Sequence, residues 1–440
     1  MIEFPLPDAF AKRLQGQLTD STVLEEALNE EAGTSIRLHP RKSKISGSLP
    51  EGNFVLWNND GLYLSERPKF GQDPLYHAGL YYPMEASSMF LKQVLDQVKL
   101  SDDAVILDLC AAPGGKTLII KDAFPDHLLV SNEIDGKRVH VLKENSIRWG
   151  TENHLIINSE AKKLQSADIT FDLIVVDAPC SGEGLFRKDK KSRAEWTEER
   201  AAGCAVRQES ILADVLPLLS DGGYLVYSTC TFNPDENMRR VAQLVEAGLT
   251  TETIPLQNDW EIDTLKEGEA TGYQFWPHKV RGEGFFVSLL KKSGEPDDVH
   301  LDIGKIKEEA FPFIPEMDFS DLIIQKLDTR FVAFTEQELN YSRALQLCGN
   351  IIKKGIYLGE IKGKDFLPSH DLSANLRAHS FINNKELSVS EAMDFLRGNA
   401  LHSSCASGPV LLKFQNLGIG IGKSNGSRIN NLLPKHLRVF

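Results

Sequence analysis

The sequence predicts an α/β protein with a central parallel β-sheet that is covered by helices on both faces. Short runs that are almost entirely apolar recur through the middle of the chain: "AVILDLC" (104–110), "HLLVSNEID" (127–135), "HLIIN" (154–158), "FDLIVVDA" (171–178) and "YLVYSTC" (224–230). Helix-forming segments separate these runs. Strands that are apolar on both faces and alternate with helices are typical of this architecture.

The helices between the strands have recognisable ends. One helix is expected from about Lys116, and an amphipathic pattern over 136–150 predicts a second that stops at Gly150. Residues 198–223 predict a long helix ending at a Gly-Gly pair, and "GEGFFVSLLKK" (282–292) predicts one further strand. These elements give a Rossmann-like central domain.

The rest of the chain predicts three more parts. Residues 1–75 are less periodic and predict a small N-terminal α+β region, with two helices and a hairpin that turns at "NNDG". Residues 76–292 hold the central domain, and residues 293–329 are acidic and contain prolines, as a linker would. Residues 330–440 show short strands with Gly and Asn turns, which predict a small β-rich domain.

Composition excludes several classes of protein. The apolar runs are too short to cross a bilayer, and the first ten residues lack the features of a signal peptide. The six cysteines form neither a CxxC pair nor a zinc-ligand pattern. We therefore expect a cytosolic protein with reduced thiols, a monomer that holds no metal and binds no membrane.

The charge is unevenly distributed. The net charge is −13, which argues against a polyanion partner, but residues 341–440 carry 13 Lys+Arg and 6 Asp+Glu. Two further basic clusters lie at "RLHPRKSK" (37–44) and "FRKDKKSR" (186–193). Any one of these clusters alone is best explained as a solvated face, but three of them favour a polyanion as a partner.

A loop rich in small residues, "LDLCAAPGGKT" (107–117), joins the first central strand to its helix. It matches neither the GxGxxG pattern of dinucleotide sites nor the phosphate-binding GxxxxGK[ST] pattern. Asp108 ends the strand, and the glycines allow the backbone to approach a ligand closely. A carboxylate beside such a loop suits a ligand with cationic groups, and S-adenosylmethionine carries both a sulfonium and an ammonium.

The next two strands also end in polar side chains. "NEID" offers Glu133, or less favourably Asp135, to a ribose diol, as in dinucleotide folds. "NSE" offers Asn158 or Glu160 where an adenine ring is expected, and the residues leave both open. Each carboxylate alone is an ordinary surface strand end, whereas the series at successive strand ends indicates a nucleoside cofactor.

Two cysteines lie at the ends of separate strands. Cys180 follows Asp177 in "DAPCSGEG", and Cys230 lies in "YSTCTF". Ligands of open parallel sheets bind at the carboxyl ends of the strands, so both thiols are expected at the cofactor end. Polar, loop-forming neighbours make them unlike buried structural cysteines. That simpler interpretation fits the cysteines without a polar motif: Cys204, Cys348 and Cys405.

These segments resemble the Sun-type RNA cytosine-5 methyltransferase family. The motifs that carry the resemblance are "LDLCAAPGGKT", "DAPCSGEG", "YSTCTFNPDEN" and "YYPMEASSM" (81–89). "GIYLGEIKGKDFLPSHDLSANL" (355–376) and "RINNLLPKHLR" (428–438) resemble the PUA-like C-terminal part of the bacterial 16S ribosomal RNA methyltransferase F branch. The similarity covers nearly the whole chain, although the first 75 residues carry little of it.

The resemblance implies a role for each residue. Cys230 is expected to attack carbon 6 of a cytosine, Cys180 to assist release, Asp177 to contact the ring nitrogen 3 edge, and Lys116 to lie in the active site. The implied S-adenosylmethionine contacts are Cys110, Ala111, Ala112, Pro113, Gly114, Gly115, Lys116, Glu133, Glu160 and Asp177.

The resemblance also ranks the substrates. Ribosomal RNA is favoured and transfer RNA is the alternative. A DNA cytosine-5 methyltransferase is disfavoured because those enzymes lack the Thr-Cys motif. A non-catalytic RNA-binding assembly factor is disfavoured because neither a cysteine nor the glycine loop is lost.

Overall fold

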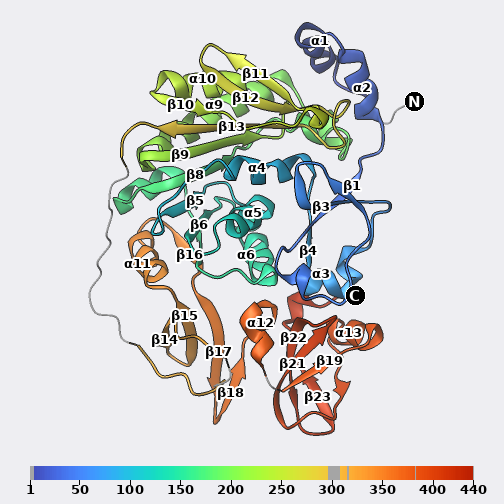
Figure 1. Cartoon of the computed structure of the whole chain (residues 1–440), viewed down its shortest axis with the longest axis vertical. Helices are drawn as coiled ribbons and strands as arrows, with labels where there is room; N and C mark the ends of the chain where they lie inside the picture. Colours follow the sequence, from blue (N-terminus) through green and yellow to red (C-terminus); the bar gives the residue numbers. More distant parts are fainter. Residues whose placement is uncertain (1–3, 296–307, 315–316, 382, 440) are drawn as a thin grey trace.

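The computed structural model, which describes residues 4–295, 308–314, 317–381 and 383–439, has the predicted α/β architecture (Figure 1). Five parallel strands form the centre of the main sheet, in the order β7-β6-β5-β8-β9. Their bounds are β5 (Val105–Asp108), β6 (Leu128–Asn132), β7 (His154–Asn158), β8 (Phe171–Asp177) and β9 (Leu219–Thr229). The strand order reverses next to β5, where ligands of open α/β sheets bind.

Antiparallel strands extend both edges of this sheet. Beyond β9 lie β13 (Phe285–Lys292), β12 (Ala270–Phe275) and β11 (Asp263–Glu267), and β10 (Leu249–Glu252) pairs with β13. Beyond β7 lies β16 (Asn350–Lys353). The sheet is therefore mixed at its edges, and the strand predicted at 282–292 is antiparallel to its neighbour.

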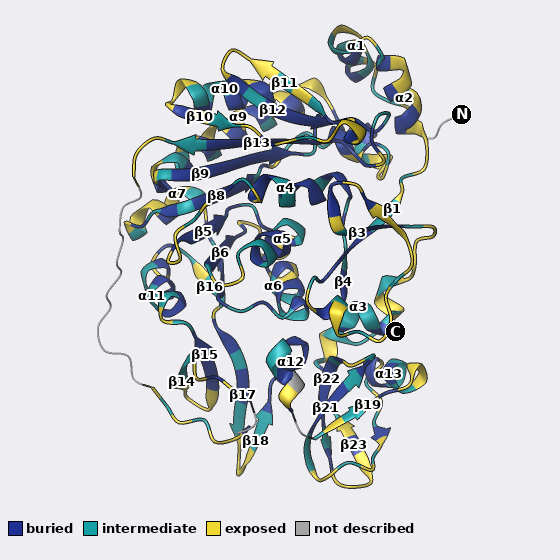
Figure 2. Ribbon diagram, viewed as in Figure 1, coloured by how far each residue is buried: buried dark blue, intermediate teal, exposed yellow. Residues whose placement is uncertain are grey.

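Alternate residues of the central strands point into two separate cores. One core packs under α4 (Leu91–Leu95), α5 (Gly115–Ala123) and α6 (Arg138–Trp149). The other packs under α7 (Ala161–Leu164), α9 (Glu198–Val215), α10 (Met238–Glu246) and α11 (Glu336–Leu345). Figure 2 shows the resulting band of buried strands between exposed helix faces.

The N-terminal region is α+β, as predicted. Its sheet has the order β2-β3-β1-β4, with β1 (Thr34–Leu38), β2 (Asn53–Val55), β3 (Asn58–Leu64) and β4 (Tyr81–Pro83). Its helices are α1 (Asp8–Gln17), α2 (Ser21–Asn29) and α3 (Pro74–His77). The hairpin exists, but it turns at Leu56 and Trp57 rather than at "NNDG". Burial of Trp57, whose Nε1–H donates to the Ala86 carbonyl at 2.7 Å, fixes the turn there.

The C-terminal part contains two sheets. One has the order β14-β15-β17-β18, with β14 (Ile323–Leu327), β15 (Arg330–Phe334), β17 (Ile356–Lys362) and β18 (Asp365–Pro368). The other consists of β19 (Asn384–Glu386), β20 (Leu401–His402), β21 (Gly408–Phe414), β22 (Leu417–Ser424) and β23 (Arg428–Asn431). The helices α12 (His370–Ala374) and α13 (Val389–Leu396) complete this part, and α13 lies beside α3 at the other end of the sequence (Figure 1).

Two predicted segments differ in the structure. The helix expected over 198–223 ends at Val215, because Pro217 follows and the Gly-Gly pair lies inside β9. Part of the expected 293–329 linker is folded: Ile314, Met317 and Phe319 are buried in a hydrophobic cluster, and β14 follows them.

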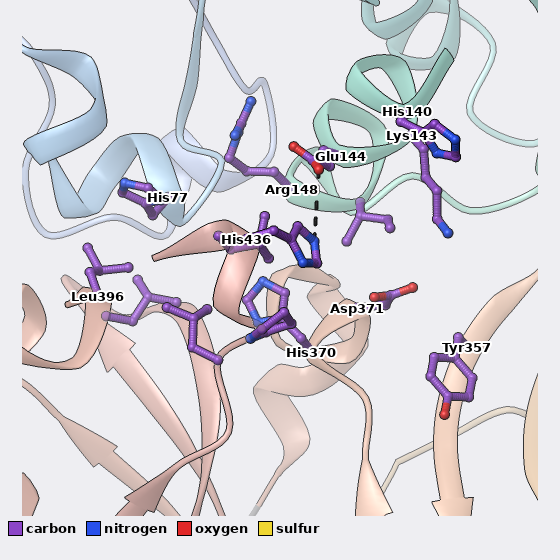
Figure 3. Close-up of a pocket in the computed structure, with 15 residues that line it drawn as sticks. His77, His140, Lys143, Glu144, Arg148, Tyr357, His370, Asp371, Leu396 and His436 are labelled. Carbon is purple, nitrogen blue, oxygen red and sulfur yellow. Dashed lines mark ion pairs between the residues drawn. The ribbon is translucent and has the colours of Figure 1, made fainter. Parts of the chain in front are cut away.

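A cavity of about 360 Å³ marks the place where the N-terminal region, α6 and the C-terminal part meet (Figure 3). His77, Arg148, His370 and His436 line it. None of the residues predicted to act in catalysis or cofactor binding lines this cavity. No helix in the described ranges is both long and apolar enough to cross a bilayer.

Gly150 is predicted to be a critical junction residue. Its φ is +82°, and a Cβ at this position would lie 2.5 Å from the Ala374 carbonyl oxygen of α12. Gly150→Ala should lower the free energy of unfolding by about 2 kcal/mol or more, measured by urea titration. Gly136→Ala, at the other end of α6, is the control, because nothing lies within 4 Å of its Cβ position. Equal losses in the two variants would contradict this account.

Candidate active site

The predicted loop lies at the carboxyl end of β5 and leads into α5. The Ala111 N–H donates to the Asn132 carbonyl at 2.9 Å, and Asn145 Nδ2 donates to the Pro113 carbonyl at 2.7 Å. Gly114 caps α5 with a φ of +113°, a conformation that favours glycine. Strand β6 and helix α6 therefore hold the loop from outside.

Asp108 has an unsatisfied polar atom beside this loop. Its side chain is fully buried, and Oδ2 accepts a hydrogen bond from Thr117 Oγ1 at 2.6 Å. Its Oδ1 has no hydrogen-bond partner in the structure. Burial raises the pKa of Asp108 to about 7, against the effect of the Thr117 hydrogen bond. A cationic ligand would satisfy the free oxygen and restore the charge, so this site fits S-adenosylmethionine.

The structure brings Glu133 to the loop. Its Oε2 accepts from the Ala112 N–H at 3.3 Å, and its Oε1 accepts from the Asp135 N–H at 2.9 Å. Asn158 lies next to it, because Asn158 Nδ2 donates to the Glu133 carbonyl at 2.6 Å. The structure does not bring Glu160 to this group: its exposed side chain pairs with Lys163 at 2.8 Å. Of the two candidates in "NSE", only Asn158 lies beside Glu133.

The two predicted cysteines meet. The Sγ atoms of Cys180 and Cys230 lie 3.2 Å apart, and both cysteines are free. The hydrogen bond with Cys230, together with burial, raises the pKa of the Cys180 thiol. Cys180 therefore remains a protonated thiol at neutral pH. A thiol that keeps its proton is suited to proton transfer rather than to attack.

A charged pair lies beside the cysteines. Lys116 Nζ lies 2.8 Å from Asp177 Oδ2, and Ser228 Oγ donates to Asp177 Oδ1 at 2.9 Å. Burial opposes the charge of Lys116, but Asp177 and Cys230 outweigh this effect and raise its pKa. The ammonium also lies 5.1 Å from the ring centroid of Phe285. The site therefore holds a permanent cation beside its thiols.

Sequence reasoning missed two residues that hold the cysteine loops. Asn237 Oδ1 accepts a hydrogen bond from Thr229 Oγ1 at 2.6 Å, and Asn237 Nδ2 donates to the Thr231 carbonyl at 2.9 Å. Asn237 therefore binds the residues immediately before and after Cys230. The Glu236 carboxylate accepts from the Ser181 N–H at 2.8 Å, next to Cys180. The sequence signal for these residues is the polar run "NPDEN" (233–237) shortly after Cys230. The structure buries its last two side chains fully or almost fully.

The N-terminal helices brace the same loops. Arg13 of α1 pairs with the buried carboxylate of Glu183 at 2.7 Å, and Gln17 Nε2 donates to the Phe232 carbonyl at 2.9 Å. Glu183 also accepts from Trp196 Nε1, just beyond α8 (Lys191–Glu195), at 3.1 Å. Within the described residues, no three His, Cys, Asp or Glu side chains gather as a metal site requires.

Comparison with known families gives three matches along the chain. The family described as 16S rRNA methyltransferase RsmB/F matches residues 95–291. The N-terminal domain of 16S rRNA methyltransferase RsmF matches residues 6–86, and the methyltransferase RsmF PUA domain matches residues 382–439.

Individual relatives agree. Ribosomal RNA small subunit methyltransferase F of Vibrio atlanticus is 30% identical over 87% of this chain and 85% of its own. The protein of that name from Aeromonas salmonicida is 29% identical over 98% of this chain and 97% of its own length. Among solved structures, a methyltransferase homolog from Pyrococcus horikoshii has a TM-score of 0.54 at 25% identity, covering 65% of this chain and 95% of that one.

These matches span the N-terminal region, the central domain with both cysteine motifs, and the second C-terminal sheet. The chain therefore belongs to the ribosomal RNA small subunit methyltransferase F family, whose members are S-adenosylmethionine-dependent methyltransferases.

Proposed function

We propose that this enzyme methylates carbon 5 of a cytosine in 16S ribosomal RNA through a covalent adduct with Cys230. The observation that carries the proposal is the 3.2 Å approach of the Cys180 and Cys230 Sγ atoms beside the Lys116–Asp177 pair. The names of the relatives favour ribosomal RNA over transfer RNA. A target base in folded RNA must first leave its stack to reach such a site.

The reaction requires a nucleophile from the enzyme, because carbon 5 of cytosine is by itself too weakly nucleophilic to take the methyl group. Cys230 Sγ adds to carbon 6, which makes carbon 5 nucleophilic enough to form a bond to the methyl group of the cofactor. Carbon 5 must then lose its proton while the bond between sulfur and carbon 6 breaks. Cys180 is the group proposed to assist this second stage, because its Sγ lies 3.2 Å from that of Cys230. Once the Cys180 thiol has passed its own proton to solvent, its sulfur accepts the carbon 5 proton, and Cys230 leaves carbon 6 as a thiolate.

Lys116 and Asp177 support the addition step. Negative charge builds on nitrogen 3 of the ring when sulfur attacks. Asp177 is the side chain proposed to contact that edge, with a proton between its carboxyl group and nitrogen 3, because a bare carboxylate would repel the charge. Lys116 fixes Asp177 and compensates the charge of the thiolate that must form. The cofactor supplies the methyl group as a sulfonium, and Asp108 and Glu133 are the carboxylates proposed to hold its cationic and ribose parts.

Two substitutions at the cysteines should fail in different ways. Cys230→Ala should lose methyl transfer by about 10³-fold or more and leave RNA migrating freely on a denaturing gel, because no adduct forms. Cys180→Ala should still attack and methylate, then stall as a covalent protein–RNA complex that survives denaturation. The complex should require both the cofactor and an RNA containing the target cytosine.

The double variant Cys180→Ala/Cys230→Ala is the control, and it should form no complex because the nucleophile acts first. Two merely structural thiols would give modest stability losses and no trapped species. A trapped complex with Cys230→Ala and none with Cys180→Ala would reverse the assignment.

Cofactor affinity should depend on pH through Asp108. Its pKa of about 7 in the free enzyme means that it is largely protonated at pH 6 and ionised at pH 8. A cationic ligand prefers the ionised form, so S-adenosylmethionine should bind about tenfold more weakly at pH 6 than at pH 8. Calorimetry measures this, and Asp108→Asn should bind weakly at both values. A pH-independent affinity in the wild type would show that Asp108 does not face the cofactor.

A further inference from the structure

A second cavity, of about 470 Å³, lies between the N-terminal region and the central domain. Its walls come from β1, the ends of β3 and β4, the segment after Cys180 and the turn before β13. Nothing in the family matches assigns a role to it. The histidine-lined cavity of Figure 3 contains none of these residues.

This cavity adjoins the cysteine site. A Cβ on Gly184 would lie 2.6 Å from the Gly284 carbonyl oxygen and 2.7 Å from that of Cys230, so the turn before β13 packs against the backbone of the nucleophile. On the other side, Met84 lines the cavity, and its Sδ would lie 3.6 Å from a Cβ on Gly115 of the cofactor loop. The turn before β13 and Met84, which line the cavity, therefore lie next to the backbone of Cys230 and to the cofactor loop.

Two of its carboxylates are already engaged and make its wall rigid. Arg187 Nε donates to both carboxylate oxygens of Glu283 at 3.1 Å, and both side chains are buried. Glu85 accepts from the backbone N–H groups of Glu283, Ser87 and Ser88 at 2.8 to 3.0 Å. These groups hold the wall in place and leave little capacity to bind a cation.

Three cations face the cavity without an ion pair among the described residues: Arg67, Lys188 and Arg281. All three are exposed. The guanidinium of Arg281 lies 4.4 Å from the ring centroid of Tyr63, and that of Arg67 lies 5.4 Å from that of Phe70. A guanidinium stacked on a ring keeps its N–H donors free around its rim. Glu30 and Glu31 also line the cavity, and neither has an ion pair within the described part of the chain.

We propose that Arg67, Lys188 and Arg281 bind the phosphates of the substrate RNA strand next to the target cytosine. The inference rests on the proposed function and names a subsite for its substrate. A base that reaches Cys230 leaves its own backbone outside the site, and this cavity is lined by residues that lie next to the site. Contacts to phosphates fix the register of a strand without reading its sequence.

The test is the salt dependence of RNA binding, measured without cofactor on a 16S ribosomal RNA transcript. Each lost phosphate contact lowers the slope of log affinity against log salt by roughly 0.7 to 0.9. Arg67→Gln/Lys188→Gln/Arg281→Gln should therefore lower the slope by about 2 and raise the KM for RNA by about tenfold or more, with a smaller effect on kcat. Arg281→Lys, which keeps the charge, should retain most of the slope.

The control is a triple variant with the same loss of charge elsewhere. Lys99→Gln/Arg207→Gln/Lys266→Gln removes three exposed cations that do not line the cavity, and it should change the slope far less. Equal slopes in the two triple variants, or an unchanged slope in the first, would overturn the proposal. Failure of the cytosine-5 chemistry is distinguishable, because it would appear as the absence of a trapped Cys180→Ala complex while binding is unaffected.

Discussion

The parallel pairing of β8 with β9 is the constraint on which the site depends. Asp177 pairs with Ser228, so the chain leaves both strands at the same edge and at the same height. The Gly184 N–H then donates to the Cys230 carbonyl at 2.8 Å, and the Ser181 and Thr231 hydroxyls lie 2.8 Å apart. Two thiols fifty residues apart in sequence therefore meet, because this register and these hydrogen bonds hold the two loops that carry them side by side.

The central domain was predictable because its signals are local. Each parallel strand is an apolar run, and the structure buries those runs on both faces. The antiparallel strand on the other edge, β16, was not predictable in the same way. β16 is only four residues long, and its pairing with β7 depends on packing across nearly two hundred residues of sequence. The buried side chains of Ile314 and Met317 lie among acidic and proline residues whose composition indicates a linker.

The same distinction applies to the site. Cys110 to Lys116, Glu133, Asp177 and the two cysteines were predicted from strand ends and from a family resemblance. The structure places the loop beside Glu133, Lys116 beside Asp177, and the two thiols side by side. Glu160 is exposed and pairs with Lys163, and a strand end does not reveal which of two nearby polar side chains lies beside Glu133. The pair Arg13–Glu183 joins residues 170 positions apart, and a charge pair at that separation leaves no pattern in one sequence.

The residues that hold the cysteines also shape the entrance to the site. Glu183, which accepts from the Phe232 N–H at 3.2 Å, ties the loop after Cys230 to α1, while Arg187 ties the segment after Cys180 to the turn before β13. The wall that would receive an RNA backbone is therefore continuous with the loops that carry both thiols. A strand bound against this wall would hold its extruded base next to the loop that carries Cys230. Such preorganisation is how positioning contributes to rate, because the geometry of attack is fixed when the substrate binds.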